Sequence, residues 1–151
     1  MNRNQVVLLV DDSENDLFLT RAAFKEAGFN SSLHEVHNGG EAIAYLKGEG
    51  AFSDRLTFPR PAVMLLDLNM PLKSGFEVLA WVRTRPDLRR MPVIVLSASM
   101  RSEDIERAFE LGANSFLVKP GAIGDLIEMI RCLRDWLQYN HFPPLNETVK
   151  R

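Results

Sequence analysis

Five polar side chains stand at or directly after the ends of short apolar runs, where their chemistry could be used. They comprise three carboxylates, one hydroxyl and one ammonium group: Asp11, Asp12, Asp67, Ser97 and Lys119. If the apolar runs form parallel strands, the carboxyl ends of these strands meet at one rim of a sheet, which is where ligands bind. Carboxylates packed together repel one another, and a divalent cation that prefers oxygen ligands, such as Mg²⁺, would relieve the repulsion.

This set of groups suits the transfer of a phosphoryl group. A carboxylate beside a bound Mg²⁺ can attack phosphorus as a nucleophile and form an acyl phosphate. Asp67 is the preferred nucleophile, because it follows the apolar run 64–66 and an unpaired carboxylate at the end of a buried strand is costly. The cation and Lys119 would neutralise charge as the group moves, and the hydroxyl of Ser97 could donate to a phosphoryl oxygen.

Each of these residues also has an ordinary structural interpretation. Asp11, Asp12 or Ser13 could simply be the N-cap of the helix that follows. Ser97 could be a hydrogen-bonded turn hydroxyl, and Lys119 could be a solvated lysine at a strand end. All of these interpretations would have to hold together at one rim, so we favour the functional one.

The elements that would position these residues alternate along the chain. Continuous apolar runs indicate strands buried on both faces, as in a parallel sheet, at 6–10, 62–66, 93–96 and 115–118, with a weaker run at 33–36. Amphipathic stretches with helix start and stop signals follow them, at about 14–27, 38–48, from 74, 102–112 and 122–139. This order predicts a flavodoxin-like (βα)5 fold of three α/β/α layers, with a doubly wound parallel sheet in the order 2-1-3-4-5.

We expect one domain over residues 1–140 and a short tail over 141–151. A long connection, 49–61, joins the second helix to the third strand. It carries apolar side chains, so we expect it to fold back on the body of the domain.

Composition narrows the possible partners and location. The chain has 151 residues, of which 46% are hydrophobic and 25% charged, as in an ordinary globular protein. Its formal net charge of −2 argues against a large nucleic-acid surface. The apolar run 6–10 is too short for a signal peptide or a membrane span. Cys132 has no partner for an internal disulfide and is expected to pack within the last helix, so we expect a cytoplasmic protein.

Four segments, in this order along the chain, make a specific combination. They are Leu8-Leu9-Val10-Asp11-Asp12, then Leu65-Leu66-Asp67-Leu68-Asn69-Met70-Pro71 with Gly75, then Val95-Leu96-Ser97-Ala98, and Phe116-Leu117-Val118-Lys119-Pro120. With these segments the chain resembles the receiver domain of two-component response regulators, over about residues 6–139.

The resemblance implies a role for each residue of the rim. Asp67 would accept a phosphoryl group from a sensor histidine kinase. Asp12 would be the principal Mg²⁺ ligand, Asp11 would act directly or through water, and the backbone carbonyl of Asn69 would complete the protein's ligands. Lys119 would pair with the phosphoryl group. The domain would also assist its own phosphorylation and dephosphorylation.

The resemblance also implies a switch. Ser97 would move towards the phosphoryl group, and Phe116 would fill the space that it leaves, which alters the face formed by the fourth helix, fifth strand and fifth helix. The Lys119–Pro120 bond would be cis, as is typical of the family. Only 151 − 119 = 32 residues follow Lys119, so we expect no fused effector and an output through protein contacts. The aromatic residues at the end of the last helix favour a homodimer through this face.

Some features depart from the usual family pattern. Serine stands at 97 where threonine is common, and phenylalanine stands at 116 where tyrosine is common. Asp12 and Asp67 are 67 − 12 = 55 residues apart, about ten more than usual, because of the long 49–61 connection. A long connection without an output domain resembles the small regulators that partner phytochrome-type histidine kinases.

Three rival functions fit the sequence less well. A hydrolase with an aspartyl-phosphate intermediate needs an acid two residues after the nucleophile, where this chain has Asn69. A receiver that acts only as a scaffold would not need the full set of rim residues. A nucleotide switch would need a phosphate-binding glycine loop after Val10, and the sequence has none there.

Overall fold

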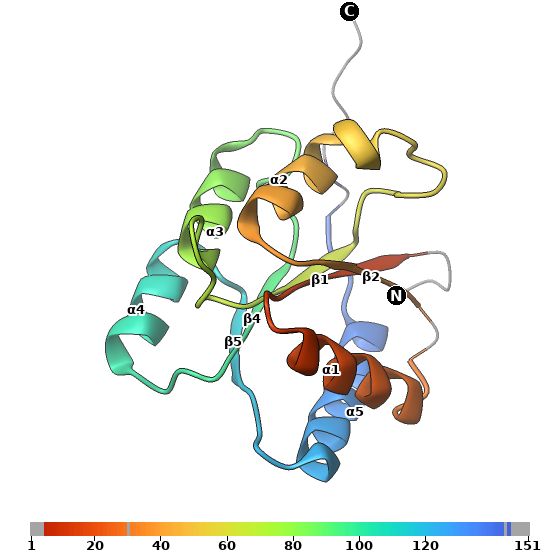
Figure 1. Ribbon diagram of the computed structural model, residues 1–151, viewed down its shortest axis with the longest axis vertical. Coiled ribbons are helices and arrows are strands. Elements are labelled where there is room, and N and C mark those ends of the chain that lie inside the picture. Colours follow the sequence, from red (N-terminus) through yellow and green to blue (C-terminus); the bar gives the residue numbers. More distant parts are fainter. Residues whose placement is uncertain (1–4, 30, 144, 146–151) are drawn as a thin grey trace, which may run out of the picture.

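A computed structural model describes residues 5–29, 31–143 and 145. Five strands alternate with five α-helices, and one short 3-10 helix lies in the 49–61 connection (Figure 1). The strands are β1 (Val6–Val10), β2 (Ser32–Val36), β3 (Val63–Leu66), β4 (Val93–Ser97) and β5 (Ser115–Val118). The helices are α1 (Glu14–Glu26), α2 (Gly39–Lys47), η1 (Gly50–Phe52), α3 (Gly75–Thr84), α4 (Ser102–Glu110) and α5 (Ile123–Tyr139). The five strands and the starts of the five α-helices lie within a few residues of their predicted positions, whereas η1 was not predicted.

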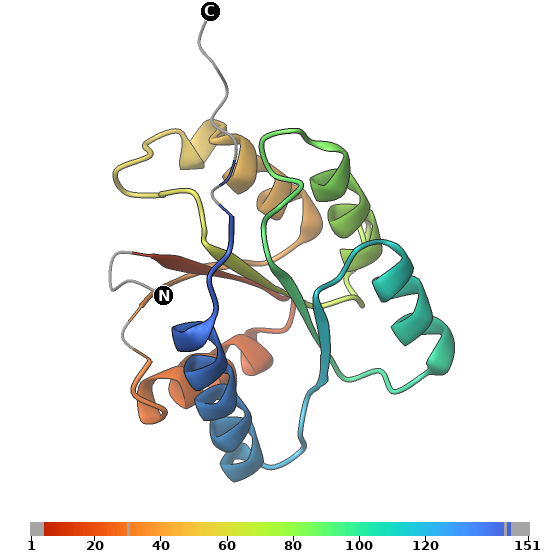
Figure 2. The same cartoon turned by 180° about the vertical axis from the view of Figure 1, so that it is seen from behind.

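The strands form one parallel sheet in the order β2-β1-β3-β4-β5, which confirms the predicted topology. The helices cover both faces, with α1 and α5 on one and α2, α3 and α4 on the other (Figures 1 and 2). The strand order reverses next to β1, so the carboxyl ends of β1 and β3 border the crevice where such folds bind ligands.

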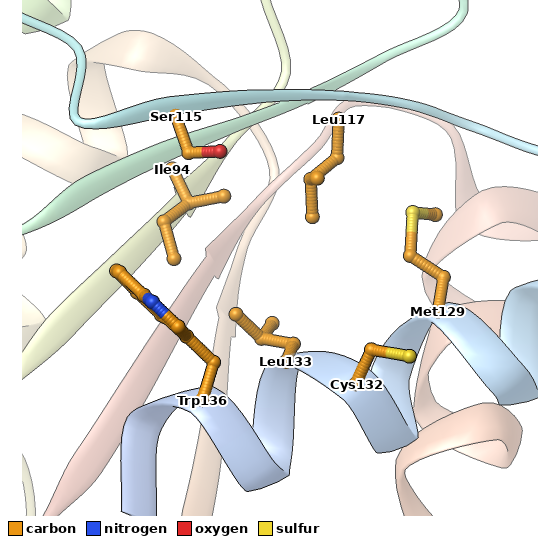
Figure 3. Close-up of a pocket in the computed structure, with 7 residues that line it drawn as sticks. All are labelled: Ile94, Ser115, Leu117, Met129, Cys132, Leu133 and Trp136. Carbon is orange, nitrogen blue, oxygen red and sulfur yellow. The ribbon is translucent and has the colours of Figure 1, made fainter. Parts of the chain in front are cut away.

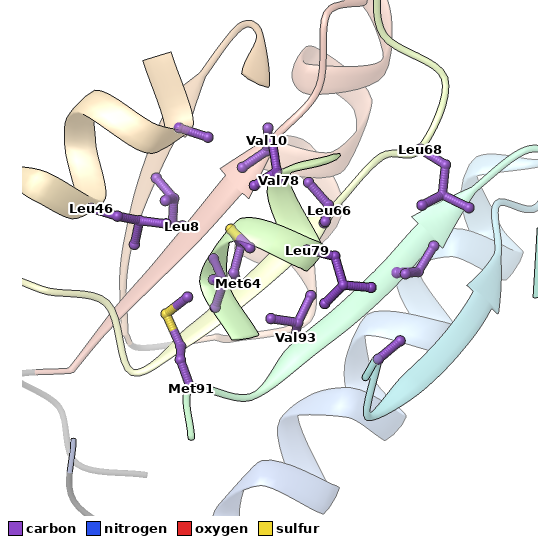
Figure 4. Packing of buried hydrophobic residues seen from close by; sticks show 14 of the residues in the cluster. Leu8, Val10, Leu46, Met64, Leu66, Leu68, Val78, Leu79, Met91 and Val93 are labelled. Atoms are coloured by element: carbon purple, nitrogen blue, oxygen red, sulfur yellow. The ribbon is translucent and has the colours of Figure 1, made fainter. Parts of the chain in front are cut away.

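Except for Ser97 at the end of β4, the inner strands β1, β3 and β4 are apolar, because their successive side chains point to opposite layers of helices. Leu8, Met64 and Leu66 pack towards α2 and α3, as Figure 4 shows for this side of the core. Leu9 and Leu65, one residue along from them, pack with α1 and α5. Every residue of β1, β3 and β4 is buried.

Two expectations about burial were wrong. The run 115–118 is not buried on both faces, because β5 is an edge strand whose first three residues are half-buried and whose last, Val118, is exposed. Cys132 is exposed rather than packed. The inward stripe of α5 instead comprises Leu126, Ile130, Leu133 and Leu137.

Local sequence signals fix the helix ends. The side chain of Asn38 caps α2 by accepting from the N–H of Glu41 at 2.8 Å, and Ser74 and Glu77 form a capping box at the start of α3. Gly48 ends α2 in the left-handed region, with φ of 71°.

The 49–61 connection folds against α2 at the amino ends of the strands. The ring of Tyr45 lies 5.2 Å from that of Phe52 and 6.0 Å from that of Phe58. Leu56, in contrast, is 94% exposed at the outer turn of the connection. Beyond α5, residues 144 and 146–151 of the predicted tail lie outside the described residues, whereas Leu145 packs against the cluster on the α2 side.

Candidate functional site

Backbone hydrogen bonds between neighbouring strands continue for one residue past the strand ends, and they position the residues of the rim. The N–H of Asp67 donates to the carbonyl of Val10 at 2.9 Å, and the N–H of Asp11 donates to the carbonyl of Val36 at 3.2 Å. The N–H of Lys119 donates to the carbonyl of Ser97 at 2.8 Å. The ends of neighbouring strands are therefore held in register, and their next side chains emerge at one rim.

Three carboxylates meet at this rim as predicted. One oxygen atom from each of Asp11, Asp12 and Asp67 lies within 4.8 Å of the others. Asp11 and Asp67 are buried, and Asp12 is exposed to solvent. A buried pair of hard oxygen donors beside an accessible third one fits a divalent cation such as Mg²⁺.

The ammonium group of Lys119 enters the same cluster from the end of β5. Its Nζ atom lies 2.5 Å from Asp11 Oδ2, 2.9 Å from Asp16 Oδ2 and 3.9 Å from Asp67 Oδ1. Burial disfavours its charge, but the hydrogen bonds to Asp11 and Asp16 and the charge of Asp67 outweigh burial and raise the pKa of Lys119. The lysine therefore remains a cation.

Asp67 carries the clearest electrostatic signature. Burial raises the pKa of its carboxyl from 3.8 to about 6, although Lys119 pulls this pKa down. The charges of Asp11 and Asp12 add to the rise, whereas a hydrogen bond from the N–H of Asn69 opposes it. Among the described residues, the ammonium group of Lys119 alone does not balance the carboxylates of Asp11, Asp12 and Asp67, so the rim favours a further positive charge.

The loop after Asp67 is tightly constrained. The N–H of Gly75 donates to the carbonyl of Leu68 at 3.1 Å, and a Cβ at position 75 would lie 2.2 Å from the carbonyl oxygen of Asp67. Only glycine fits there, which explains the Gly75 noted in the sequence. Leu72 in the same loop has φ of 66° and a fully exposed side chain.

The predicted switch residues lie on neighbouring strands. Ser97 is fully buried, and its Oγ accepts from the N–H of Ser99 at 3.2 Å. The hydroxyl of Ser99 in turn donates to Asp104 in α4 at 2.5 Å. Phe116 is half-buried and packs against the cluster under α2, α3 and α4. The loop from β4 to α4 is thus connected to Ser97 through hydrogen bonds.

Two findings differ from or add to the expectations for the site. The Lys119–Pro120 bond is trans, as are all peptide bonds in the described part of the chain; the preference between the two forms is only about 0.5–1 kcal/mol for a bond to proline, so the sequence could not decide it. Asp16 was not predicted at all. Its one sequence signal is its position three residues after Ser13, which also fits an ordinary helix start.

No helix among the described residues is long and apolar enough to cross a membrane.

Comparison with known proteins agrees with this geometry. The profile of the response regulator receiver domain matches residues 7–131. Response regulator Rcp1 from Synechocystis sp. is 37% identical over 138 residues, which cover 91% of this chain and 92% of that protein. The structure of the Mn²⁺-bound form of Rcp1 superposes with a TM-score of 0.81 at 36% identity, over 92% of this chain and 99% of the other.

A phosphorylated relative is also similar. The cyanobacterial phytochrome response regulator RcpA, whose structure was solved in the phosphorylated form, superposes with a TM-score of 0.84 at 33% identity, over 93% of this chain and 99% of the other. The resemblance to phytochrome-associated regulators is thereby confirmed. Both the sequence match and the arrangement of the rim lead to one assignment: the chain belongs to the response regulator receiver family of two-component signalling.

Proposed function

We propose that the protein accepts a phosphoryl group from the phosphohistidine of a sensor histidine kinase onto Asp67 in a Mg²⁺-dependent reaction, and signals through altered protein contacts. The observation that carries this proposal is the buried carboxylate of Asp67, which lies among Asp11, Asp12 and Lys119 and has a pKa raised to about 6. Such a site holds its nucleophile in place and retains negative charge that a cation would balance.

The transfer step balances with the groups present. An oxygen of ionised Asp67 attacks phosphorus and forms a P–O bond, while the P–N bond to the donor imidazole breaks and the imidazole takes that electron pair. Lys119 neutralises charge on the phosphoryl oxygens during the step. The signal would end by dephosphorylation, in which water attacks the phosphorus of the acyl phosphate, releases phosphate and restores the carboxylate of Asp67. We propose that the rim residues assist both steps.

The residues that would hold Mg²⁺ are Asp12, Asp11, Asp67 and the backbone carbonyl of Asn69. When bound, the cation would supply positive charge next to the phosphoryl oxygens. Asp11 already accepts hydrogen bonds from Ser13 N–H and Lys119, so its carboxylate is held in place at the rim. Asp67 accepts from the N–H of Asn69, which orients the nucleophile without using a side chain.

The conformational response would start at Ser97. Its hydroxyl would leave the N–H of Ser99 and donate to a phosphoryl oxygen, and Phe116 would move into the vacated space. The hydrogen bond from Ser99 to Asp104 would carry this change into α4. Phosphorylation would thus shift the balance between two conformations that both exist beforehand.

The output surface in this proposal is the face of α4, β5 and α5, through a homodimer. Three aromatic side chains at the end of α5 are partly exposed: Trp136 at 43%, Tyr139 at 81% and Phe142 at 37%. A mostly apolar pocket of about 240 Å³ lies between α5 and strands β4 and β5, as Figure 3 shows, with Trp136 and Met129 at its sides. An apolar face of this kind supports association. A monomer mass that does not change with concentration, with and without phosphorylation, would contradict the dimer.

The partner kinase is proposed to be of the phytochrome type, because RcpA is described as a phytochrome response regulator and covers 93% of this chain. The proposed location is the cytoplasm. In support of it, the single cysteine, Cys132, is free and exposed.

The test is intact-protein mass after incubation with acetyl phosphate, with and without Mg²⁺. Wild type should gain one phosphoryl adduct only when Mg²⁺ is present, and Asp67→Asn should gain none. Asp54→Asn is the matched control, since the same chemical change at the amino edge of the sheet should leave the adduct intact. An adduct that survives in Asp67→Asn would mean that another residue is the acceptor, and no adduct in wild type with either acetyl phosphate or a phosphorylated kinase would refute phosphoryl acceptance.

A further inference from the structure

The carboxylate of Asp16 does not accept the backbone hydrogen bond that is usual at its position in a helix. Asp16 is the third residue of α1, where an acidic side chain commonly accepts from the N–H of the capping residue, here Ser13. In this chain the N–H of Ser13 donates instead to Asp11 Oδ1 at 3.0 Å. The backbone N–H of Asp16 still donates to Ser13 Oγ at 3.2 Å, so the helix start is kept while the carboxylate is free to point elsewhere.

That carboxylate binds Lys119. Nζ lies within hydrogen-bond distance of both Asp11 and Asp16, at 2.5 and 2.9 Å, but 3.9 Å from Asp67. The ammonium group is thus shared between one predicted metal ligand and one residue outside the metal cluster. The Lys119 side chain is only 13% exposed, so water supplies little alternative solvation for its charge.

We infer that Asp16 is a positioning residue that draws Lys119 away from Asp67 in the resting state. The inference rests on the proposed function, because it concerns the same rim. Without Asp16, the ammonium group would pair with Asp11 and Asp67 alone and would compete with a divalent cation for these carboxylates. With Asp16 present, the lysine has a partner to retain when the cation enters, and it stays close enough to reach a phosphoryl group on Asp67.

Two simpler roles for Asp16 need to be separated from this one. An acidic residue in the first turn favours the helix dipole, and any carboxylate near the rim attracts cations through long-range charge. Glu14 shares both properties, since it lies in the same first turn, but its side chain is 78% exposed and pairs with His37 at 3.3 Å. Glu14→Gln is therefore the matched control for Asp16→Asn.

The test is Mn²⁺ affinity, measured by the loss of the free-ion electron paramagnetic resonance signal, on wild type and four variants. These are Asp16→Asn, Glu14→Gln, Lys119→Met and the Asp16→Asn/Lys119→Met double variant. Asp16→Asn should weaken binding roughly three- to tenfold, and Glu14→Gln less than about twofold. Lys119→Met should tighten binding, because it removes the competing cation. In the Lys119→Met background Asp16→Asn should change affinity less than about twofold.

Together these variants form a double-mutant cycle, which separates the positioning of Lys119 by Asp16 from an effect of its charge alone. If Asp16→Asn weakens binding equally with and without Lys119, Asp16 acts by long-range charge alone and the inference is refuted. An Asp16→Asn effect no larger than that of Glu14→Gln refutes it too. This measurement needs no phosphoryl transfer, so its failure is distinct from failure of the proposed function: a wild type that binds Mn²⁺ but gains no adduct would refute the function and leave the role of Asp16 standing.

Discussion

The carboxyl edge of the sheet gathers carboxylates around one ammonium group, whereas the amino edge pairs its charge with backbone oxygens. At the carboxyl edge, burial and the charges of Asp11 and Asp12 raise the pKa of Asp67 to about 6. At the amino edge, the guanidinium of Arg55 donates to the carbonyls of Tyr45, Leu46 and Phe58, at 2.7, 2.8 and 3.1 Å. The two edges differ in function under this proposal, because only the carboxyl edge would bind a cation and accept a phosphoryl group.

The difference shows where the fold is stabilised. Arg55 donates to two carbonyls in the last turn of α2, where a helix end leaves few backbone N–H groups to pair with them. Tyr45, Phe52 and Phe58 add an aromatic cluster in which Tyr45 is buried and the two phenylalanines are partly buried. The carboxyl edge instead holds like charges in a buried place, which costs stability. Lys119 offsets part of this cost, and a bound cation or a change of protonation would relieve more of it.

The largest effect is expected at the amino edge. Tyr45 is 1% exposed and its hydroxyl donates to the carbonyl of Pro59 at 2.9 Å. Tyr45→Ala should therefore lower the free energy of unfolding by about 3–5 kcal/mol, through a cavity and an unpaired carbonyl. Urea denaturation measures this loss, and the folded variant should still accept a phosphoryl group on Asp67.

The control for this prediction is Phe18→Ala. Phe18 is also aromatic but 61% exposed, so its removal should change the free energy of unfolding by less than about 0.5 kcal/mol. A loss for Tyr45→Ala as small as that expected for Phe18→Ala would show that the aromatic cluster at the amino edge does not stabilise the fold.

A smaller effect of opposite sign is expected at the carboxyl edge. Asp67→Asn removes a buried charge whose side chain is only 8% exposed, and should raise the free energy of unfolding of the metal-free protein at pH 7 by roughly 1–3 kcal/mol, at about 1.4 kcal/mol per pKa unit. Urea denaturation in a metal chelator measures it. The gain should disappear when Mg²⁺ is added in excess, because the cation stabilises only the wild type.

The pH dependence follows from the direction of the shift. The folded-state pKa of Asp67, about 6, is above the ordinary value of 3.8. Below both values the carboxyl is protonated in the folded and unfolded states, so it imposes no penalty. As the pH rises through this interval, the unfolded state ionises first and the wild type loses stability, until the loss is complete above the folded-state pKa. The advantage of Asp67→Asn should therefore grow between pH 4 and pH 6 and then level off.

Asp54→Asn, at the amino edge, should behave differently. Hydrogen bonds from Thr57 and from the N–H of Leu56 lower the pKa of Asp54, so its charge is favoured by the fold. This substitution should not stabilise the protein at any pH in the same range. A stabilising Asp54→Asn would remove the contrast between the two edges.

Much of the carboxyl edge could be predicted from the sequence, because parallel strands place their end residues together whatever the details of packing. The continuous apolar runs at 6–10, 62–66 and 93–96 indicated burial on both faces, and Asp11, Asp67 and Lys119 followed from their positions after strands. The burial of 115–118 was predicted wrongly because an edge strand can have the same apolar composition as a central one.

The finer pairing at the rim could not be predicted. The choice of Lys119 between Asp11, Asp16 and Asp67 depends on which acceptor takes the N–H of Ser13, and the sequence does not show the positions of these side chains. The hydrogen bonds of Arg55 could not be predicted either, because the sequence of the 49–61 connection does not indicate which carbonyls its guanidinium contacts.

The smallest predicted effect compares one exposed leucine at each edge. Leu72, near Asp67, has φ of 66°, a left-handed conformation that costs a branched apolar residue about 1 kcal/mol, and its side chain makes no compensating buried contact. Asparagine tolerates this conformation better, so Leu72→Asn should raise the free energy of unfolding by about 0.5 kcal/mol, measured by urea denaturation. Leu56, 94% exposed at the amino edge, has no positive φ, and Leu56→Asn should have no effect beyond error. If both substitutions stabilise equally, the gain comes from a less apolar surface, and the strain at the loop after the phosphoacceptor contributes nothing.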